Sequence, residues 1–234
     1  MRLIQLMAEV LPAGAVVAGG TIHSGTGFLF AEEEIFARPM SAKRRQEFVA
    51  GRHYAREALR ALGCAPAPIP VQLSRAPAWP PGFVGTISHG HGLCAAIVAR
   101  RSSLASVGID IEDADPLPAD LVPLVCRAAD FNDRSWIERS IGADLPKLVF
   151  VLKEAFYKAY QAVAESFLDF VDVEVTIDPT LCRFEARVVN DSRPSCAEHH
   201  ALGGRFGRVQ DTLFAVAWLT AAGTNNCRPA KRAG

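Results

Sequence analysis

The chain has 234 residues, of which 50% are hydrophobic and 21% charged, with 25 basic and 25 acidic side chains. This composition excludes a disordered or collagen-like chain, and a net charge of zero gives no global attraction to nucleic acid or anionic membranes. The six cysteines form no Cys-x-x-Cys pair, so we expect reduced thiols, no zinc site and a cytoplasmic protein.

The first long stretch without charges, residues 10–31, is unsuited to spanning a membrane. It contains five glycines, Pro12 and His23, which a stable membrane helix would not tolerate. Upstream, Gln5 and Glu9 interrupt the apolar run that a signal peptide needs. We therefore expect a protein without a membrane segment.

A long helix is predicted from Ser41, a good N-cap residue, to about Leu62, with Gly63 beyond its end. At about 100° per residue its apolar stripe comprises Phe48, Ala55, Leu59 and Leu62, and a basic cluster at the edge of the stripe comprises Arg45, Arg52 and Arg56. Such a cluster is most often solvated surface, so by itself it indicates no site.

Strand-like runs follow a proline-rich connector at 77–82. The first three are 83–87, 93–99 and 105–111, and a glycine-bounded turn at 88–92 separates the first two. The stretch 113–123 is rich in acids and prolines and predicts a loop between the two halves of the chain.

A second long helix is predicted from about Pro146 to Val163. Its apolar side comprises Leu148, Leu152, Ala155, Ala159 and Val163, and its opposite face comprises Lys147, Glu154, Lys158 and Gln161. The strand-like runs that follow are 171–177, 183–189 and 212–219.

Each half of the chain therefore has a long helix followed by antiparallel strands, which predicts an α+β fold of two similar halves. We place the N-terminal half at 1–107, the C-terminal half at 108–222 and a frayed tail at 223–234. The halves share an order of elements but no repeat of residue identities, so we expect a pseudo-two-fold relation in the fold alone.

The segment Gly108 to Glu112 is the sharpest local feature. On a strand, Asp110 and Glu112 project to one side while Ile109 and Ile111 face the core. Two carboxylates that point the same way repel unless a cation lies between them, and Mg²⁺ prefers such hard oxygen ligands. A solvated strand end is the alternative interpretation of the same pattern.

The polar face of the second helix offers a further acid, Glu154, one turn before Lys158. An ordinary surface ion pair at this spacing contributes only about 0.3–0.5 kcal/mol and would carry no function. Because the rest of the helix is apolar, Glu154 could instead complete a site of three acids with Asp110 and Glu112.

The Ser88-His89 pair in the predicted turn could donate hydrogen bonds to a phosphate. A Ser-His dyad for acyl hydrolysis is disfavoured, because adjacent side chains point apart and no Gly-x-Ser-x-Gly motif is present. The chain also lacks a P-loop and a dinucleotide-binding glycine motif.

Four ordered motifs together resemble the 4′-phosphopantetheinyl transferases, in particular the long single-chain branch that includes the enterobactin-synthase component D proteins. The first motif comprises RRQEF at 44–48, GR at 51–52 and AREAL at 55–59, and the second comprises Arg75, Pro77, WP at 79–80, Gly82 and GTISH at 85–89. The third is GIDIE at 108–112, and the fourth is KEA at 153–155 with Lys158. Two positions depart from the pattern: Phe150 replaces a common Trp, and Gly90 replaces a common hydroxyl residue.

The resemblance implies coenzyme A as donor and a serine of an apo acyl or peptidyl carrier protein as acceptor, with the active site in a cleft between the halves. It implies that Asp110, Glu112 and Glu154 hold Mg²⁺ or Mn²⁺, while Arg44, Arg52, Ser88 and His89 bind the 3′-phosphate. Arg75 and Lys153 are further candidates on the nucleotide side. Helical spacing alone favours Arg45 as the neighbour of Arg52, whereas the family pattern favours Arg44.

In the implied reaction the serine hydroxyl attacks the phosphorus that bears the pantetheine arm. The implied catalytic group is Glu154, Lys158 and Asp110. Glu154, directly or through a water, would act as base, and Lys158 would stabilise the leaving phosphate without easily reaching the metal. The mixed apolar and basic stretch 117–127 would face the carrier protein.

Two other functions remain as alternatives. A metal-dependent phosphohydrolase could use the same acids with water as acceptor, and a catalytically silent nucleotide-binding module would need neither metal nor transfer. We expect a monomer that binds neither nucleic acid nor membrane. The pathway, whether siderophore, polyketide, nonribosomal peptide or fatty-acid assembly, stays open.

Overall fold

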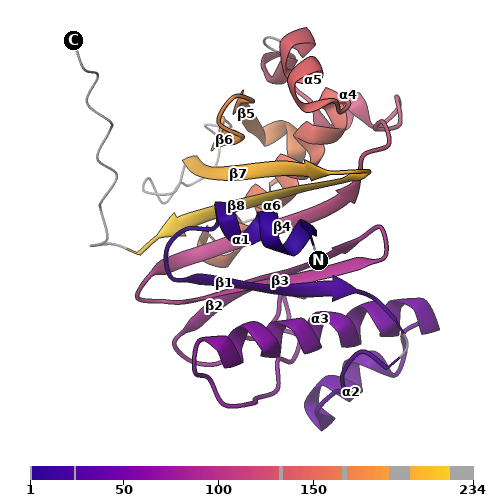
Figure 1. Cartoon of the computed structure of the whole chain (residues 1–234), viewed down its shortest axis with the longest axis vertical. Helices are drawn as coiled ribbons and strands as arrows, with labels where there is room; N and C mark the ends of the chain where they lie inside the picture. Colours follow the sequence, from indigo (N-terminus) through magenta and orange to yellow (C-terminus); the bar gives the residue numbers. More distant parts are fainter. Residues whose placement is uncertain (1, 24, 132–133, 165–167, 190–200, 222–234) are drawn as a thin grey trace.

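A computed structural model describes the chain except for residues 1, 24, 132–133, 165–167, 190–200 and 222–234, and Figure 1 shows its arrangement. The expected frayed tail at 223–234 lies outside the described residues. None of the described helices is long and apolar enough to cross a bilayer.

The N-terminal part forms a three-stranded antiparallel sheet in the order β1-β3-β2. The strands are β1 (Ala15–Thr21), β2 (Phe83–Gly90) and β3 (Leu93–Arg100). The long helix α3 (Ala42–Ala61) packs on this sheet, and α2 (Ala31–Ala37) and α1 (Arg2–Val10) complete the region (Figure 1). Ser41 caps α3 as predicted, because its Oγ accepts a hydrogen bond from the Arg44 N–H at 3.4 Å.

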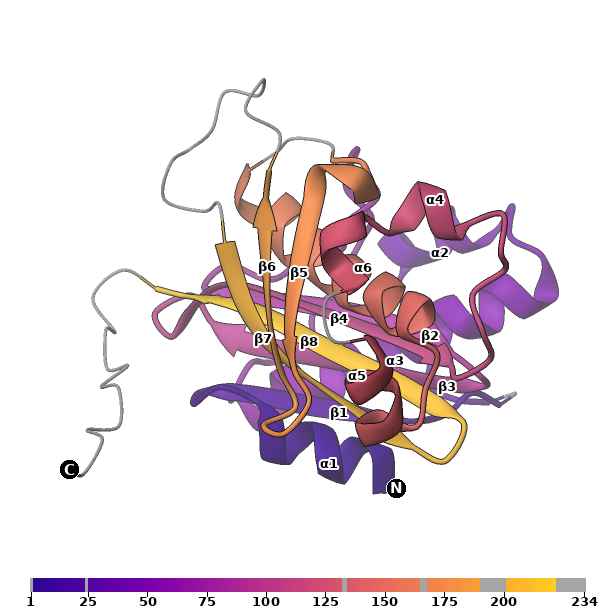
Figure 2. The same ribbon diagram turned by 90° about the horizontal axis from the view of Figure 1, so that it is seen from above.

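The C-terminal part forms a five-stranded antiparallel sheet in the order β4-β8-β7-β6-β5. The strands are β4 (Leu104–Asp113), β5 (Val173–Asp178), β6 (Arg183–Val188), β7 (Ala201–Val209) and β8 (Thr212–Thr220). The second long helix, α6 (Leu145–Ala164), packs on β4 and β8, and the short helices α4 (Val122–Val125) and α5 (Arg134–Ile141) precede it in the chain. Figure 2 shows α4 and α5 on the same side of this sheet as α6.

Apolar side chains join these layers in the order α3, three-stranded sheet, five-stranded sheet, α6. Ala96 and Val98 of β3 face α3, while Ala95 and Ile97 of the same strand face the second sheet. The buried residues that the second sheet contributes to the shared layer are Leu104, Val107, Ile109, Ile111, Phe214 and Val216. The two sheets therefore share one core, and α6 covers the other face of the second sheet.

The predicted α+β class is confirmed, with a long helix packed on an antiparallel sheet in each part. The pseudo-two-fold relation and the boundary at 107/108 stay predictions, and the chain passes from one sheet to the other at 101–103. The predicted turn at 88–92 is wrong. β2 continues through Gly90, and the turn consists only of His91 and Gly92, whose φ angles are 51° and 73°.

Candidate active site

The strand β2 connects two groups of polar side chains because its residues alternate between two neighbours. Thr86 and Ser88 point toward β4, where the Ile109 N–H donates to Thr86 Oγ1 at 3.2 Å and Ser88 Oγ donates to Asp110 Oδ1 at 3.1 Å. His89 points the other way, toward α3, and contacts Arg44. The resemblance implied that Ser88 and His89 both bind the 3′-phosphate, whereas the structure places their side chains in different clusters.

Two glycines allow the close approach of the elements that carry the acids. A Cβ at Gly90 would lie 2.2 Å from the carbonyl oxygen of Ile111, so the absence of a hydroxyl side chain here has a steric reason. A Cβ at Gly108 would lie 2.1 Å from the carbonyl oxygen of Ala155 on α6. These contacts bring β2 and α6 against β4 next to Asp110.

The acid–lysine cluster consists of Asp110, Glu112, Glu154, Lys147 and Lys158. Lys158 Nζ donates to Asp110 Oδ1 at 2.6 Å, and it lies 4.0 Å from Glu154 Oε2. Lys147 Nζ pairs with Glu112 Oε2 at 3.3 Å. The expectation that Lys158 reaches the leaving phosphate but not easily the metal stays a prediction, and its ammonium contacts Asp110, one of the predicted metal ligands.

Burial and mutual repulsion change the acidity of two of these acids. Burial raises the pKa of Glu154, and the charges of Asp110 and Glu112 raise it further against the opposing effect of Lys158. Burial also raises the pKa of Glu112, with Asp110 as the next cause and Lys147 opposing it. Repelling carboxylates of this kind favour a bound cation.

The cluster fits a hard cation in the number and type of its oxygens. Asp110 Oδ2 is buried without a hydrogen-bond partner, so one oxygen of the most enclosed acid has no donor. Among the described residues, however, no three His, Cys, Asp or Glu side chains already surround a common metal position. Lysines supply the counter-charge instead, Lys158 at Asp110 and Lys147 at Glu112.

The basic cluster on the other side of β2 consists of Arg44, Glu47, Arg52 and His89. Arg44 Nη1 contacts His89 Nε2 and donates to Glu47 Oε2 at 3.2 Å, while Glu47 Oε2 lies 3.8 Å from His89 Nε2. Burial lowers the pKa of His89, although Glu47 opposes this shift. Sequence reasoning missed Glu47 as a site residue, although it lies inside the RRQEF motif.

Arg52 is buried in α3 with its guanidinium 4.1 Å from the centre of the Phe48 ring, and its Nε donates to the Ile69 carbonyl oxygen at 2.8 Å. Burial lowers its pKa to about 10, and the nearby charges of Arg56 and Arg44 act in the same direction against Glu33. Arg45, in contrast, pairs with Glu34 of α2 at 2.7 Å. The structure therefore places Arg44, and not Arg45, beside His89.

The two remaining nucleotide-side candidates differ in their surroundings. Lys153 is 1% exposed, and its Nζ donates to Asp130 Oδ2 at 2.7 Å, Val125 O at 2.9 Å and Phe170 O at 3.1 Å. Its three N–H groups are thus all taken by the protein, which argues against the predicted phosphate contact. Arg75 is exposed in a turn with a φ of 69°.

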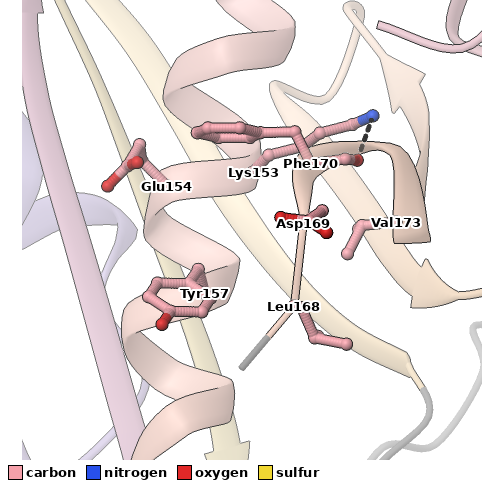
Figure 3. A pocket seen from close by; sticks show the side chains of 7 residues that line it. All are labelled: Lys153, Glu154, Tyr157, Leu168, Asp169, Phe170 and Val173. Carbon is pink, nitrogen blue, oxygen red and sulfur yellow. Dashed lines mark hydrogen bonds between the residues drawn. The ribbon is translucent and has the colours of Figure 1, made fainter. Parts of the chain in front are cut away.

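A pocket of about 170 Å³ opens beside Glu154 on α6 (Figure 3). Tyr157 lies one turn along the same helix, and the segment from Leu168 to Val173 forms the facing wall. Phe170 holds this wall to α6 through its carbonyl oxygen, which accepts from Lys153. The lining is mostly apolar, and Glu154 belongs both to the pocket and to the acid–lysine cluster.

Comparison with known families gives two matches that follow each other along the chain. Residues 31–99 match the model of the 4′-phosphopantetheinyl transferase N-terminal domain, and residues 106–217 match that of the 4′-phosphopantetheinyl transferase superfamily. The second match includes all residues of the acid–lysine cluster.

Three named relatives are similar to between 53% and 81% of this chain. The 4′-phosphopantetheinyl transferase PptT of Mycobacterium tuberculosis is 36% identical over 197 residues, which are 81% of this chain and 85% of that protein. The 4′-phosphopantetheinyl transferase Svp of Streptomyces mobaraensis is 34% identical over 196 residues, 79% of this chain and 76% of that protein. Enterobactin synthase component D of Salmonella typhi is 33% identical over 130 residues, 53% of this chain and 51% of that protein.

Proposed function

The chain belongs to the 4′-phosphopantetheinyl transferase superfamily, and we propose that it transfers the 4′-phosphopantetheine arm of coenzyme A to a serine hydroxyl of an apo acyl or peptidyl carrier protein. Adenosine 3′,5′-bisphosphate leaves in this reaction. The observation that carries the proposal is the meeting of Asp110, Glu154 and Lys158 on one side of β2, with Arg44 and His89 on the other. A molecule with separate phosphate groups needs two such charged regions.

The acids are proposed as the ligands of a divalent cation. The family uses coenzyme A as co-substrate and generally depends on a metal, and Asp110, Glu112 and Glu154 would hold Mg²⁺ or Mn²⁺ here. When bound, such a cation neutralises charge on the pyrophosphate oxygens. The orphaned Asp110 Oδ2 supports this assignment.

The basic cluster is proposed as the site for the 3′-phosphate. Arg44 and His89 already lie in contact, and the buried guanidinium of Arg52 adds a charge that water screens poorly. Ser88 is left out of this group because it hydrogen-bonds Asp110, and it is proposed to orient that carboxylate instead. Arg75 stays a candidate on the nucleotide side.

Two residues of α6 are proposed to handle the protons and charge of the transfer. Glu154 accepts the proton of the attacking serine hydroxyl, directly or through a water, and its raised pKa suits a base. The Lys158 ammonium stabilises the leaving phosphate, where charge grows as the P–O bond breaks. The protein otherwise contributes position and electrostatics.

The pocket beside Glu154 is proposed to receive the pantetheine arm. The arm is uncharged, and the pocket wall is mostly apolar with Tyr157 and Phe170 among its residues. Because Glu154 is shared with the acid–lysine cluster, the arm would extend from the reacting phosphorus directly into this pocket.

The carrier protein is proposed to dock on the segment 117–127. Leu121 and Leu124 are 39% and 63% exposed, so they are available for contact, whereas Leu117, Val125 and Cys126 of the same segment are buried. The expectations of a cytoplasmic monomer that binds neither nucleic acid nor membrane stay predictions. Siderophore assembly is one pathway that fits the similarity to enterobactin synthase component D.

Intact-mass analysis of candidate apo carriers, incubated with the protein, coenzyme A and Mg²⁺, tests the proposal. We expect one phosphopantetheine to be added to the carrier serine, and no addition to a Ser→Ala carrier. Free phosphopantetheine or inorganic phosphate with an unchanged carrier would indicate the phosphohydrolase instead. The transferase and synthase names of the relatives give that alternative no support.

A further inference from the structure

The Lys158 ammonium lies among four oxygen atoms, two of which belong to the proposed cation ligands Asp110 and Glu154. It donates to Asp110 Oδ1 at 2.6 Å, to the Ile109 carbonyl oxygen at 3.1 Å and to Ser88 Oγ at 3.4 Å, and Glu154 Oε2 lies 4.0 Å away. These are the surroundings of a bound cation, with the lysine side chain as the cation.

The backbone keeps this lysine close to Asp110. A Cβ at Gly108 would lie 2.1 Å from the Ala155 carbonyl oxygen and 3.1 Å from Lys158 Cβ, so α6 presses directly on β4. Asp110 itself is 4% exposed. The Lys158 Cβ is therefore fixed beside β4, while its side chain is 30% exposed, so a change of its own side-chain torsions is enough to move the ammonium away from Asp110.

We propose that Lys158 competes with the divalent cation for Asp110, so that the cation binds fully only after the ammonium has left this carboxylate. The proposal rests on the proposed function in one respect, that Asp110 and Glu154 are cation ligands. It adds that a catalytic lysine also sets the metal affinity, by acting as the internal counter-ion of the site.

The competition has a consequence for the order of binding. The phosphates of coenzyme A offer the displaced ammonium a new partner, so coenzyme A binding frees Asp110 for the cation. By linkage, a bound cation must then raise the affinity for coenzyme A by the same factor. Lys158 thus lowers the metal affinity in the absence of coenzyme A, and its ammonium contacts the phosphates when the cation and coenzyme A are both bound.

Metal affinity without coenzyme A tests this directly. We would measure Mn²⁺ binding to the whole chain by the electron paramagnetic resonance signal of free Mn²⁺, with calorimetry for Mg²⁺. Lys158→Met removes a positive charge next to the ligands, and we expect Mn²⁺ to bind at least about tenfold more tightly. Lys158→Arg keeps the charge and should bind Mn²⁺ nearly as weakly as the parent.

The control is Arg60→Met, which removes one positive charge from an exposed pair with Glu57 on α3 and should leave Mn²⁺ binding unchanged. Lys158→Gln, which retains a donor for Asp110, replaces Lys158→Met should the latter not fold. Unchanged or weaker Mn²⁺ binding in the folded variant, including the absence of binding, would overturn the competition. Carrier modification by the parent protein is measured separately, so that failure of the proposed function is recognised independently.

Discussion

At the scale of single residues, alternation along β2 decides which chemistry each side chain joins. Ser88 and His89 are adjacent in sequence, yet one hydrogen-bonds Asp110 and the other contacts Arg44. The same alternation places Gly90 against β4, where its missing side chain lets the two strands approach. One strand thus serves both charged regions of the site.

The first prediction concerns the 3′-phosphate. Arg44→Met or His89→Ala should weaken binding of coenzyme A by roughly tenfold to a hundredfold, because a charge-assisted hydrogen bond contributes about 1.5–3 kcal/mol. Binding of dephospho-coenzyme A, which lacks this phosphate, should change little. Calorimetric titration with both donors measures the difference.

Arg45→Met is the matched control, because Arg45 follows Arg44 in the chain but pairs with Glu34 of α2. It should leave the preference for coenzyme A intact. Equal weakening toward both donors in Arg44→Met would place that residue elsewhere in the mechanism.

The second prediction concerns Gly90. Gly90→Ser places a Cβ 2.2 Å from the Ile111 carbonyl oxygen, so β2 must move away from β4. We expect a loss of about 1–3 kcal/mol in the free energy of unfolding, as for other overpacked positions, together with lower transferase activity. Gly203→Ala serves as control, because a Cβ there would lie 3.8 Å from the Phe184 carbonyl oxygen, an ordinary van der Waals contact. Urea titration of both variants decides whether the steric explanation holds.

The third prediction concerns the pH dependence of stability. The folded-state pKa of Glu154 lies above its ordinary value, mainly through burial. Between the unfolded-state pKa and the folded-state pKa, the folded protein therefore binds more protons than the unfolded protein, and stability falls as pH rises. Glu154 therefore lowers stability toward neutral pH in the absence of divalent ions. Glu154→Gln should melt at a higher temperature than the parent at pH 7, with the difference shrinking toward pH 4.

Thermal unfolding in a chelating buffer measures this, and Glu57→Gln on the exposed face of α3 is the control. A constant difference in melting temperature between Glu154→Gln and the parent across the pH range would contradict the assigned direction.

At the scale of elements, a buried ion pair holds α6 to the segments around it. Asp130 accepts from Lys153 of α6 at 2.7 Å and from the Val175 N–H of β5 at 2.9 Å. Lys153 also reaches the carbonyl oxygens of Val125 and Phe170, so it joins α6 to α4 and to the wall of the pocket. These contacts also position Glu154, the next residue of α6.

The fourth prediction separates the structural role of Lys153 from the predicted contact with the nucleotide. Lys153→Met leaves Asp130 buried and uncompensated, and should lower the free energy of unfolding by about 3–5 kcal/mol. Adding Asp130→Asn should restore much of the loss, because no unpaired charge remains and the amide oxygen still accepts from the Val175 N–H. Chemical denaturation of the parent, the two single variants and the double variant gives the coupling energy.

Kinetics of the double variant decides the functional question. If Lys153 only positions α6, the KM for coenzyme A should stay close to that of the parent once stability is restored. A KM that stays raised in the stable double variant would support the nucleotide contact.

At the scale of the whole molecule, the site exists because two sheets share a core. Ala95 and Ile97 of the first sheet and Ile109 and Val216 of the second bury their side chains in the same layer. The basic cluster belongs to the first sheet and its helix α3, while the acids belong to the second sheet and its helix α6. Coenzyme A would therefore contact both parts of the fold.

The fifth prediction follows from that shared layer. Separating the sheets would expose the whole layer, so calorimetry should show one cooperative unfolding transition, with equal calorimetric and van't Hoff enthalpies. A fragment ending at residue 103 should not fold by itself. Two resolved transitions in the intact chain would show that the parts are independent.

The sequence by itself determined the elements with strong local signals and the acids of β4. Ser41 and the apolar periodicity predict α3 to within a residue or two of its bounds, and the alternation in 108–112 places Asp110 and Glu112 on one face. The strands β1 and β7 were missed. Their glycines, such as Gly19 and Gly204, weaken a strand pattern locally, and are explained only by close neighbours, Cys94 and Phe184.

Only the tertiary structure decided which charged groups meet. Spacing along α3 favoured Arg45 as the neighbour of Arg52, but Arg45 forms an ion pair with Glu34 of α2. A pairing between two separate helices cannot be predicted from the local sequence pattern. Lys153 and Lys158 lie on one helix five residues apart, yet one is enclosed by Asp130 and the other contacts Asp110. Sequence spacing sets the direction in which a side chain leaves its helix, whereas the neighbour it finds there depends on how distant segments pack.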